Sequence, residues 1–519
     1  MAQQQTSPRT KPLRVSVGND ILEITGFFVF GDHAAGEESA RAFLNSLQSA
    51  PDAPPFADCC GAYRAFAERA DGTRVYFADN AGCLCWFYRP DCAQFTDSLL
   101  ASLPANERVQ NHAAIAQFLY FGCVYSLDTI FAGVFRSDPN ACYLVSNGRV
   151  ETHSKGLPPL SAFVTTRDAL ERLMRRVTKA ADGLTLGCAI TGGTDSRSIL
   201  SHLLSNGAHP RLTITGADTD ADVRLAKEIA GIAGEPLSVF SDAPTPGEAW
   251  LPGVMRAADG MAGACGAYRL HRQSLGLRDA GVAVKFGGNA GELYKNSFLN
   301  QDFPFYGGKP NWERFLRFKV MTYDFPQGIC AGETEREIRG MRDTLLSKFS
   351  VYEGKTKASA YLSAGYDIMQ ARGITLSNME SAACTAYSPL MERAVAASAF
   401  LFSPYALEMQ AWQRREVTQF CPALKDVPTD RGLTCDSARA ASEWVKSTLF
   451  LLSVACSRVL RRKRVVERVD ACFAEGLASP EYHAALARCK ALGILAPDAA
   501  NLPRSIADRV LTLGASFAE

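Results

Sequence analysis

The stretch LTLGCAITGGTDSRSIL, residues 184–200, decides the fold class of this chain. It begins with a short apolar run ending at Ile190, a pattern typical of a strand that is buried on both faces. Gly192 and Gly193 then permit a tight turn, and the residues from Ser198 onward have the pattern of a helix. Strand, glycine turn and helix together predict an α/β fold, in which backbone N–H groups and a helix dipole converge on a site suited to phosphate.

Polar side chains around the two glycines suit the same kind of ligand. Three hydroxyls can bind phosphate oxygens, and the carboxylate of Asp195 can hold Mg²⁺ beside them. Two glycines between a strand and a helix also occur in connections that bind nothing, and the spacing is not the GxxxxGK[ST] of a Walker A loop. The candidates for binding ATP or pyrophosphate in this stretch are Thr191, Gly192, Gly193, Thr194, Asp195, Ser196 and Arg197.

The stretch resembles the S-G-G-x-D-S loop of the PP-loop (N-type) ATP pyrophosphatases, with Thr191 in the first position. Enzymes with that loop split ATP between the α and β phosphates, and the loop holds the departing pyrophosphate. The resemblance implies a PP-loop domain of the adenine nucleotide α-hydrolase type. It also implies ATP and Mg²⁺ as cofactors.

The length of 519 residues is sufficient for two domains and a small third, each with its own core. With 47% hydrophobic and 21% charged residues, the composition is typical of a soluble globular protein. A net charge of +1 gives no electrostatic reason to expect a nucleic acid or an anionic membrane as partner. The polar start predicts a disordered tail over residues 1–12. Because this start has no apolar leader, we expect a cytoplasmic protein. Its sixteen scattered cysteines are then expected to be reduced thiols.

Residues 13–160 are expected to form a β-rich domain, because short alternating runs follow one another and DGT marks a hairpin turn. The region resembles the glutaminase-like, Ntn-type N-terminal domain of the asparagine synthetases. The matching positions are Asp79, Gly82, Gly122, Thr129 and Gly133. A glutaminase of that class needs a cysteine as its first residue, whereas here Ala2 follows Met1 and the first cysteine is Cys59. We therefore expect a degenerate scaffold without glutamine hydrolysis.

Residues 161–436 alternate helical patterns with apolar strands, which favours a parallel sheet covered by helices. The strand RLTITG, residues 211–216, leads into an acidic stretch. In asparagine synthetase-like enzymes the second strand contacts adenine and an acidic residue follows, so the resemblance makes Thr215 and Asp222 candidates. The alternative is that these acids form the solvated N-terminus of a helix.

A second glycine motif occurs in AVKFGGNAGELY, residues 283–294. It places Gly287, Gly288 and the carboxylate of Glu292 after another apolar strand, and two such turns can bracket one nucleotide at a topological switch point. The motif resembles the family's G-x-G-x-D-E-L-F loop, except that Gly291 occupies the Asp position. Asp195 and Glu292 would then have to carry the metal. A purely structural turn is the alternative.

The cation of the site is less well defined. In the amide-forming relatives a lysine in an R-x-K-x-G loop steadies developing negative charge, but this chain has Thr429, Asp430, Arg431 and Gly432 there. Arg431 can supply the cation, as can Arg197. An arginine that only fixes the loop is an equal alternative. Residues 437–519 are expected to form a helical C-terminal extension.

The resemblance to class B asparagine synthetases, with an altered front domain as in β-lactam synthetases and lasso-peptide cyclases, implies an AMP-forming ligase. It would adenylate a carboxylate with ATP and Mg²⁺ for attack by an amine, and Asp195, Glu292 and Arg431 are the expected catalytic residues. Its partners would be a small-molecule or peptide carboxylate and an amine donor, and no nucleic acid or membrane is expected. The sequence is compatible with a homo-oligomer. The alternatives are a PP-loop sulfurtransferase or tRNA-modifying enzyme, and a non-catalytic nucleotide-binding homologue.

Overall fold

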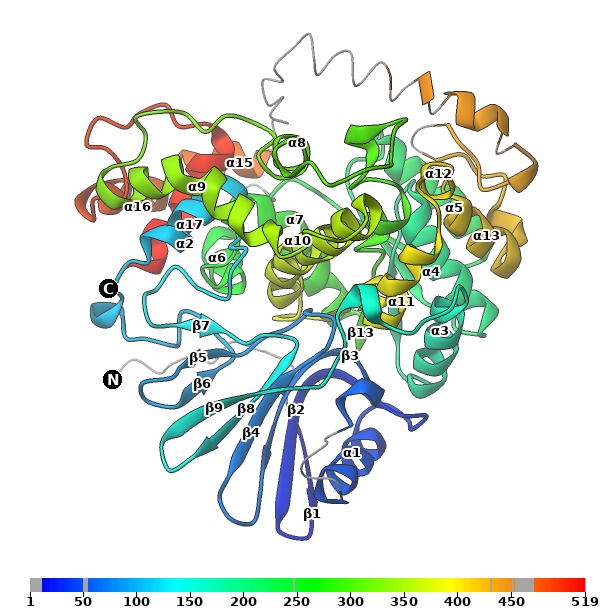
Figure 1. Cartoon of the computed structure of the whole chain (residues 1–519), viewed down its shortest axis with the longest axis horizontal. Helices are drawn as coiled ribbons and strands as arrows, with labels where there is room; N and C mark the ends of the chain where they lie inside the picture. Colours follow the sequence, from blue (N-terminus) through cyan, green and yellow to red (C-terminus); the bar gives the residue numbers. More distant parts are fainter. Residues whose placement is uncertain are drawn as a thin grey trace.

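The computed structural model describes residues 12–49, 55–245, 248–429, 432–439, 441–446, 448–449, 452 and 471–518. Over these residues the chain is a mixed α/β protein with a six-stranded antiparallel sheet, a five-stranded parallel sheet and a three-stranded sheet (Figure 1). The predicted α/β class, with a β-rich N-terminal part followed by a parallel sheet and helices, is therefore confirmed. Of the tail predicted at residues 1–12, only Pro12 is described.

The antiparallel sheet is built mainly from consecutive hairpins and has the order β1-β2-β3-β4-β8-β9. The predicted DGT turn joins its third and fourth strands, where Glu68 pairs with Arg74. Its strands are β1 (Leu13–Val17), β2 (Asp20–Phe30), β3 (Cys59–Glu68), β4 (Arg74–Ala78), β8 (Ala141–Ser146) and β9 (Arg149–Ser154). The three-stranded sheet beside it consists of β6 (Gln94–Thr96), β5 (Phe87–Arg89) and β7 (Phe135–Arg136).

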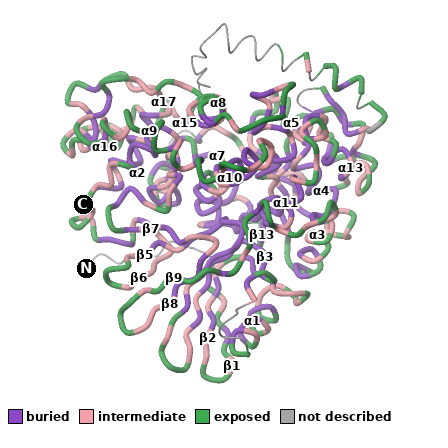
Figure 2. The backbone as a smooth tube through the Cα atoms, in the orientation of Figure 1, coloured by how far each residue is buried: buried purple, intermediate pink, exposed green. Residues whose placement is uncertain are grey.

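Strand β2 contributes to two separate cores. The Phe28 ring packs on Phe43 of α1 (Glu37–Ser49), with ring centroids 5.8 Å apart. The neighbouring Phe27 faces the other way and packs on Phe286 of the parallel sheet, at 6.2 Å. Because successive residues of a strand point to opposite faces, this sheet rests on α1 with one face and on the parallel part with the other. Figure 2 shows the buried residues concentrated where the two sheets meet.

The parallel sheet has the order β12-β11-β10-β13-β14, and all of its neighbouring strands run parallel. The chain therefore builds outward from β10 in one direction and then returns to add strands on the other side of β10. The topological switch point lies between β10 and β13. The strands are β10 (Leu186–Ala189), β11 (Arg211–Thr215), β12 (Leu237–Phe240), β13 (Val284–Phe286) and β14 (Thr385–Tyr387).

Helices cover this sheet. Helices α4 and α5 pack on β10, β11 and β12 from crossover connections, and α7 packs on β11 and β12 from the connection that returns the chain to β13. The helices of this part are α3 (Ala169–Ala180), α4 (Thr194–Ser205), α5 (Ala221–Ala233), α6 (Leu251–Ala258), α7 (Ala264–Asp279), α8 (Trp312–Phe315), α9 (Gly332–Ser350), α10 (Lys357–Glu380), α11 (Arg393–Ser398), α12 (Pro404–Glu408) and α13 (Ala411–Phe420).

Two local features differ from the sequence-based expectation. Helix α4 begins at Thr194, four residues before the expected start at Ser198, because Gly193 has an extended conformation and serves as its N-cap. Thr194, Asp195 and Ser196 are thus the first helical turn. The edge strand β14 was not predicted, since its three residues follow the long helix α10 without any alternating pattern.

The C-terminal helices return to the rest of the molecule. They are α15 (Ala471–Leu477), α16 (Pro480–Ala491) and α17 (Arg504–Ser516), and α17 packs on both α7 and α2 (His112–Phe121). Asp508 of α17 accepts hydrogen bonds from the backbone N–H groups of Cys265 (2.7 Å) and Gly266 (3.0 Å) in the first turn of α7. The last helix therefore joins the N-terminal part to the parallel part.

The described part of the chain contains fifteen cysteines, none of them in a disulfide. Thirteen are buried, whereas Cys92 is exposed and Cys421 is intermediate. Within the same residues, none of the helices has the length and apolar character needed to cross a membrane.

Candidate functional site

The first glycine turn lies at the carboxyl end of β10, in the middle of the parallel sheet. Hydroxyl groups hold its shape: the Thr191 N–H donates to Ser196 Oγ at 3.1 Å, and the Gly193 N–H donates to Thr191 Oγ1 at 3.2 Å. The Thr194 hydroxyl donates to Gln410 Oε1 at 3.1 Å. The predicted residues from Thr191 to Ser196 therefore form one ordered turn that opens the α4 helix.

The neighbouring strand places two more candidates at the same edge of the sheet. The Gly192 N–H donates to Asp222 Oδ1 at 3.1 Å, so a carboxylate of α5 occupies one anion-binding N–H of the turn. Thr215 ends β11; its hydroxyl is buried without a hydrogen-bond partner, while its carbonyl accepts from Arg269 at 2.9 Å. Asp222 therefore contacts the glycine turn, and Thr215 lies at the end of the strand that pairs with β10.

The second glycine motif follows β13 and lies directly against the first turn of α4. The Gly287 N–H is committed to the Tyr387 carbonyl of β14, at 2.9 Å. A Cβ at Gly288 would lie 2.7 Å from the Ser196 backbone nitrogen, and a Cβ at Gly291 would lie 2.0 Å from Asp195 Cγ. Only glycine permits this approach, so the two turns form one site at the switch point.

Two carboxylates belong to this site. Asp195 is in the first turn of α4, and Glu292 is in the short helical turn Gly291–Tyr294. Burial, and after it the negative charge of Asp195, raises the pKa of Glu292, and its Oε2 atom is buried without a hydrogen-bond partner. Paired carboxylates with an unsatisfied oxygen fit a divalent cation. No set of three or more His, Cys, Asp or Glu residues in the described part of the chain forms a metal cluster, so phosphate or water oxygens would have to complete the coordination.

Two residues that the sequence analysis did not single out contact Asp195. Lys295 Nζ lies 2.6 Å from Asp195 Oδ2. Gln413 of α13 donates from Nε2 to Asp195 Oδ1 at 3.4 Å, and its own Oε1 is buried without a partner. Lys295 directly follows the ELY segment, so a cation next to the second motif was visible in the sequence. Gln413 comes from a helix more than 200 positions away, and no local pattern indicates it.

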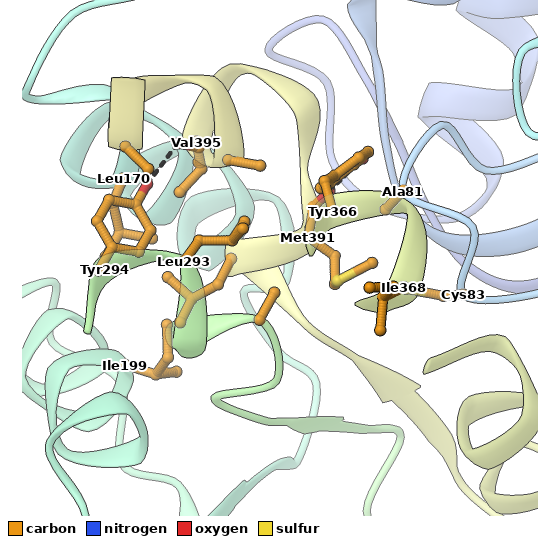
Figure 3. Close-up of a cluster of buried hydrophobic side chains, with 14 of the residues drawn as sticks. Ala81, Cys83, Leu170, Ile199, Leu293, Tyr294, Tyr366, Ile368, Met391 and Val395 are labelled. Carbon is orange, nitrogen blue, oxygen red and sulfur yellow. Dashed lines mark hydrogen bonds between the residues drawn. The ribbon is translucent and has the colours of Figure 1, made fainter. Parts of the chain in front are cut away.

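The second turn is anchored by the core behind it. Figure 3 shows Leu293 and Tyr294 packed in one apolar cluster with Ile199 of α4, Leu170 of α3 and Val395 of α11. The Tyr294 hydroxyl donates to the Val395 carbonyl. Its ring stacks on Trp412, with centroids 3.9 Å apart. The carboxylate of Glu292 therefore projects from a rigid backbone.

Of the two arginines expected to supply positive charge, the structure describes only Arg197. Arg197 is fully buried and donates to the backbone carbonyls of Val427 (2.6 Å), Pro428 (3.1 Å) and Gly192 (3.3 Å). This geometry corrects the view of Arg197 as a free cation for phosphate: it ties the glycine turn to residues 427–428, because buried carbonyls need donors. Arg431 and its neighbour Asp430 lie outside the described residues.

The N-terminal positions selected by the resemblance to a glutaminase lie in turns, in a loop and in the buried core. Asp79 is buried and accepts the N–H groups of Cys83 and Leu84, both at 2.8 Å, and burial raises its pKa to about 6. Gly82 adopts a left-handed conformation in the turn beyond Asp79, as Gly122 and Gly133 do in their own turns, while the Thr129 hydroxyl is bonded to its own loop. Cys59, the first cysteine, is buried, and burial raises the pKa of its thiol to about 12. Such a thiol is neither accessible nor ionised near neutral pH.

No family model matches the chain, and no curated protein matches its sequence significantly. The function is therefore inferred from the geometry of the site.

Proposed function

We propose that this protein is an ATP-dependent, AMP-forming ligase of the asparagine synthetase-like type. It would combine a PP-loop domain with an Ntn-like N-terminal scaffold. One observation carries the proposal: two glycine turns from adjacent strands meet at the switch point of a parallel sheet, with Asp195 and Glu292 between them. Ligands of such sheets bind at this place, and helix N-termini there favour phosphate.

In the proposed reaction a substrate carboxylate attacks the α-phosphate of ATP, and an amine then displaces AMP from the acyl-adenylate. The turn from Thr191 to Ser196 would hold the pyrophosphate, while Thr215 and Asp222 would border the nucleoside. Asp195 and Glu292 would hold Mg²⁺, which when bound neutralises phosphate charge. The tie between Arg197 and residues 427–428 keeps the turn in place for the leaving group.

The N-terminal part supports an amine source other than glutamine. Its first cysteine is buried under strand contacts, and the raised thiol pKa opposes a nucleophilic role. The amine would then be free ammonia, another metabolite or a group of the same substrate. In the last case the substrate would be cyclised by its own amine, as in the β-lactam synthetases and lasso-peptide cyclases.

Each alternative is addressed by a specific observation. A sulfurtransferase needs an accessible thiol, but Cys188 on the strand before the turn is fully buried, and burial raises its pKa to about 12.

A non-catalytic nucleotide-binding protein is favoured by the contacts of Lys295 with Asp195 and of Asp222 with Gly192, which occupy groups that a ligase needs. We retain it as the second candidate.

The first test combines nucleotide binding with ATP–pyrophosphate exchange, using panels of carboxylic acids and amines. We expect exchange that depends on Mg²⁺ and on a carboxylate, and we expect Asp195→Asn to lower it by about 100-fold or more because a charged ligand group is lost. Asp279→Asn is the matched control, since this exposed residue pairs with Arg278 at the far end of α7.

The outcomes separate the candidates. ATP binding without exchange for any acid would support the non-catalytic protein. Exchange that requires an added RNA would support a tRNA-modifying enzyme. Failure to bind ATP or pyrophosphate at millimolar concentrations would reject the nucleotide site itself.

A further inference from the structure

An ammonium group lies directly against the carboxylate that would hold the metal. Lys295 Nζ lies 2.6 Å from Asp195 Oδ2, and the two side chains are 25% and 15% exposed. Among the described residues Asp195 is the one ion-pair partner of Lys295 within 4 Å, and the lysine charge also acts on Glu292, whose pKa it lowers against the larger effect of burial. An ammonium group has three N–H donors, so further donors are available to a ligand on the open side.

The residues on both sides of Lys295 are held by buried contacts. Tyr294 is fully buried and stacked on Trp412. Asn296 is also fully buried, in a left-handed conformation with a φ of 56°, and donates to Tyr306 Oη (2.7 Å) and Glu408 Oε2 (2.6 Å). The lysine thus extends from a rigid base into the site. Its single ion pair is partly open to solvent and not fully buried, so the side chain can change partners provided that both charged groups find new ones.

Two residues next to Asp195 each have a buried polar atom without a hydrogen-bond partner. Gln413 is fully buried next to Asp195, and its Oε1 has no hydrogen-bond partner. The Oε2 atom of Glu292 is likewise buried and also has no hydrogen-bond partner. Buried polar atoms are costly to leave unpaired. Their presence on residues next to Asp195 supports a ligand that completes the site.

We propose that Lys295 is a phosphate-binding residue that exchanges partners. It pairs with Asp195 in the absence of nucleotide and moves to the β and γ phosphates when Mg²⁺ binds the carboxylates. This inference rests on the proposed nucleotide site. A magnesium nucleotide carries both an anion for Lys295 and a cation for Asp195, so each group of the broken pair regains a charge-assisted partner. Lys295 thereby provides the positive charge that the buried Arg197 cannot.

The test measures affinities by calorimetry for ATP, pyrophosphate and AMP, with and without Mg²⁺, at constant ionic strength. For Lys295→Met we expect the affinity for ATP and pyrophosphate to fall by about tenfold or more, with AMP affinity unchanged within about twofold. Lys295→Arg should restore most of the loss because it keeps the charge. Lys490→Met is the control, since α16 lies on the side of the molecule away from α4 (Figure 1). Urea unfolding of each variant verifies that it is folded.

The possible results lead to different conclusions. If wild-type protein binds ATP but Lys295→Met binds ATP and pyrophosphate equally well, the exchange is wrong and the proposed function stands. If Lys295→Met binds magnesium ATP more tightly, Lys295 is only an occluding group, which also overturns the inference. If the wild-type protein binds none of the three ligands, both proposals fail together.

Discussion

Position 291 is a glycine because a neighbouring carboxylate occupies the space that a side chain would need. The sequence motif that residues 283–294 resemble has an aspartate at the corresponding position, so the sequence alone suggested the loss of a metal ligand. In the structure, however, the Asp195 carboxylate packs against the Gly291 Cα, and a Cβ would lie 2.4 Å from each carboxylate oxygen. We interpret Gly291 as a residue that positions Asp195.

This interpretation predicts the behaviour of Gly291→Ala. The added methyl must displace the Asp195 carboxylate, which pairs with Lys295, so we expect a loss of about 1 kcal/mol in the free energy of unfolding. In an Asp195→Ala background the same substitution should change stability by less than about 0.5 kcal/mol, because the clashing atoms are gone. Urea unfolding of the four proteins measures this coupling. Equal losses in both backgrounds would show that Gly291 serves a different purpose.

Glu392 connects the two sheets and predicts a pH dependence. Its Oε1 accepts the Gly61 N–H (2.9 Å) and the Tyr387 hydroxyl (3.1 Å). Burial raises the pKa of Glu392 to about 7, although the Gly61 bond partly offsets the shift. Since the folded pKa exceeds the unfolded value, stability from this group is complete below the unfolded pKa and is lost as pH rises through about 7.

The glutamine variant removes this titration and keeps the acceptor oxygen. Relative to wild type, Glu392→Gln should gain about 2 kcal/mol of unfolding free energy between about pH 5 and about pH 8. Urea unfolding at both pH values measures the difference, and Glu481→Gln on the exposed first turn of α16 is the control. A constant difference between variant and wild type would contradict a raised pKa at Glu392.

Among the elements, strands β2 and β3 each contain a glycine whose positive φ would direct a Cβ into the backbone of the partner strand. These glycines are Gly26 and Gly61, with φ values of 109° and 126°, and a Cβ at Gly61 would lie 2.0 Å from the Phe27 carbonyl oxygen. We expect Gly61→Ala to cost about 3 kcal/mol, from strain plus backbone displacement. Gly148→Ala, in the β8–β9 turn with open space around it, should cost only about 1 kcal/mol. Urea midpoints test the ranking, and similar costs at both positions would refute the predicted backbone clash at Gly61.

The elements also show what sequence patterns can predict here. RLTITG and AVKFGG were correctly identified as strands, since apolar runs ending in glycine carry their own signal. The start of α4 was placed one turn too late, because its first-turn residues also suit a loop. The contacts of Lys295 and Gln413 with Asp195 depend on strand order and on a distant helix, and no local pattern encodes either. The two turns and their approach at one sheet edge were predictable from the sequence, whereas the individual contacts of Lys295 and Gln413 with Asp195 were not.

At the scale of the whole molecule, α17 contacts both the N-terminal part and the parallel part, so we expect the two to unfold as one cooperative unit. Asp508→Ala leaves the Cys265 and Gly266 N–H groups at the start of α7 without their acceptor, so we expect a loss of about 2 kcal/mol. Asp508→Asn, which keeps one acceptor, should lose less. Fluorescence and circular dichroism should still report one coincident transition in urea. Two separate transitions in the wild-type protein would disprove the single unit.

The cysteines lie at different depths and in different regions, so their reactivity can report which region of the molecule opens first. Cys92 is exposed, while Cys60 lies at the junction of the sheets, Cys188 beneath the glycine turn and Cys489 under α17. An alkylating reagent can therefore reach Cys92 in the closed protein and each deeper sulfur only after its own region has separated. Mass mapping of the modified cysteines would reveal the sequence in which the regions come apart.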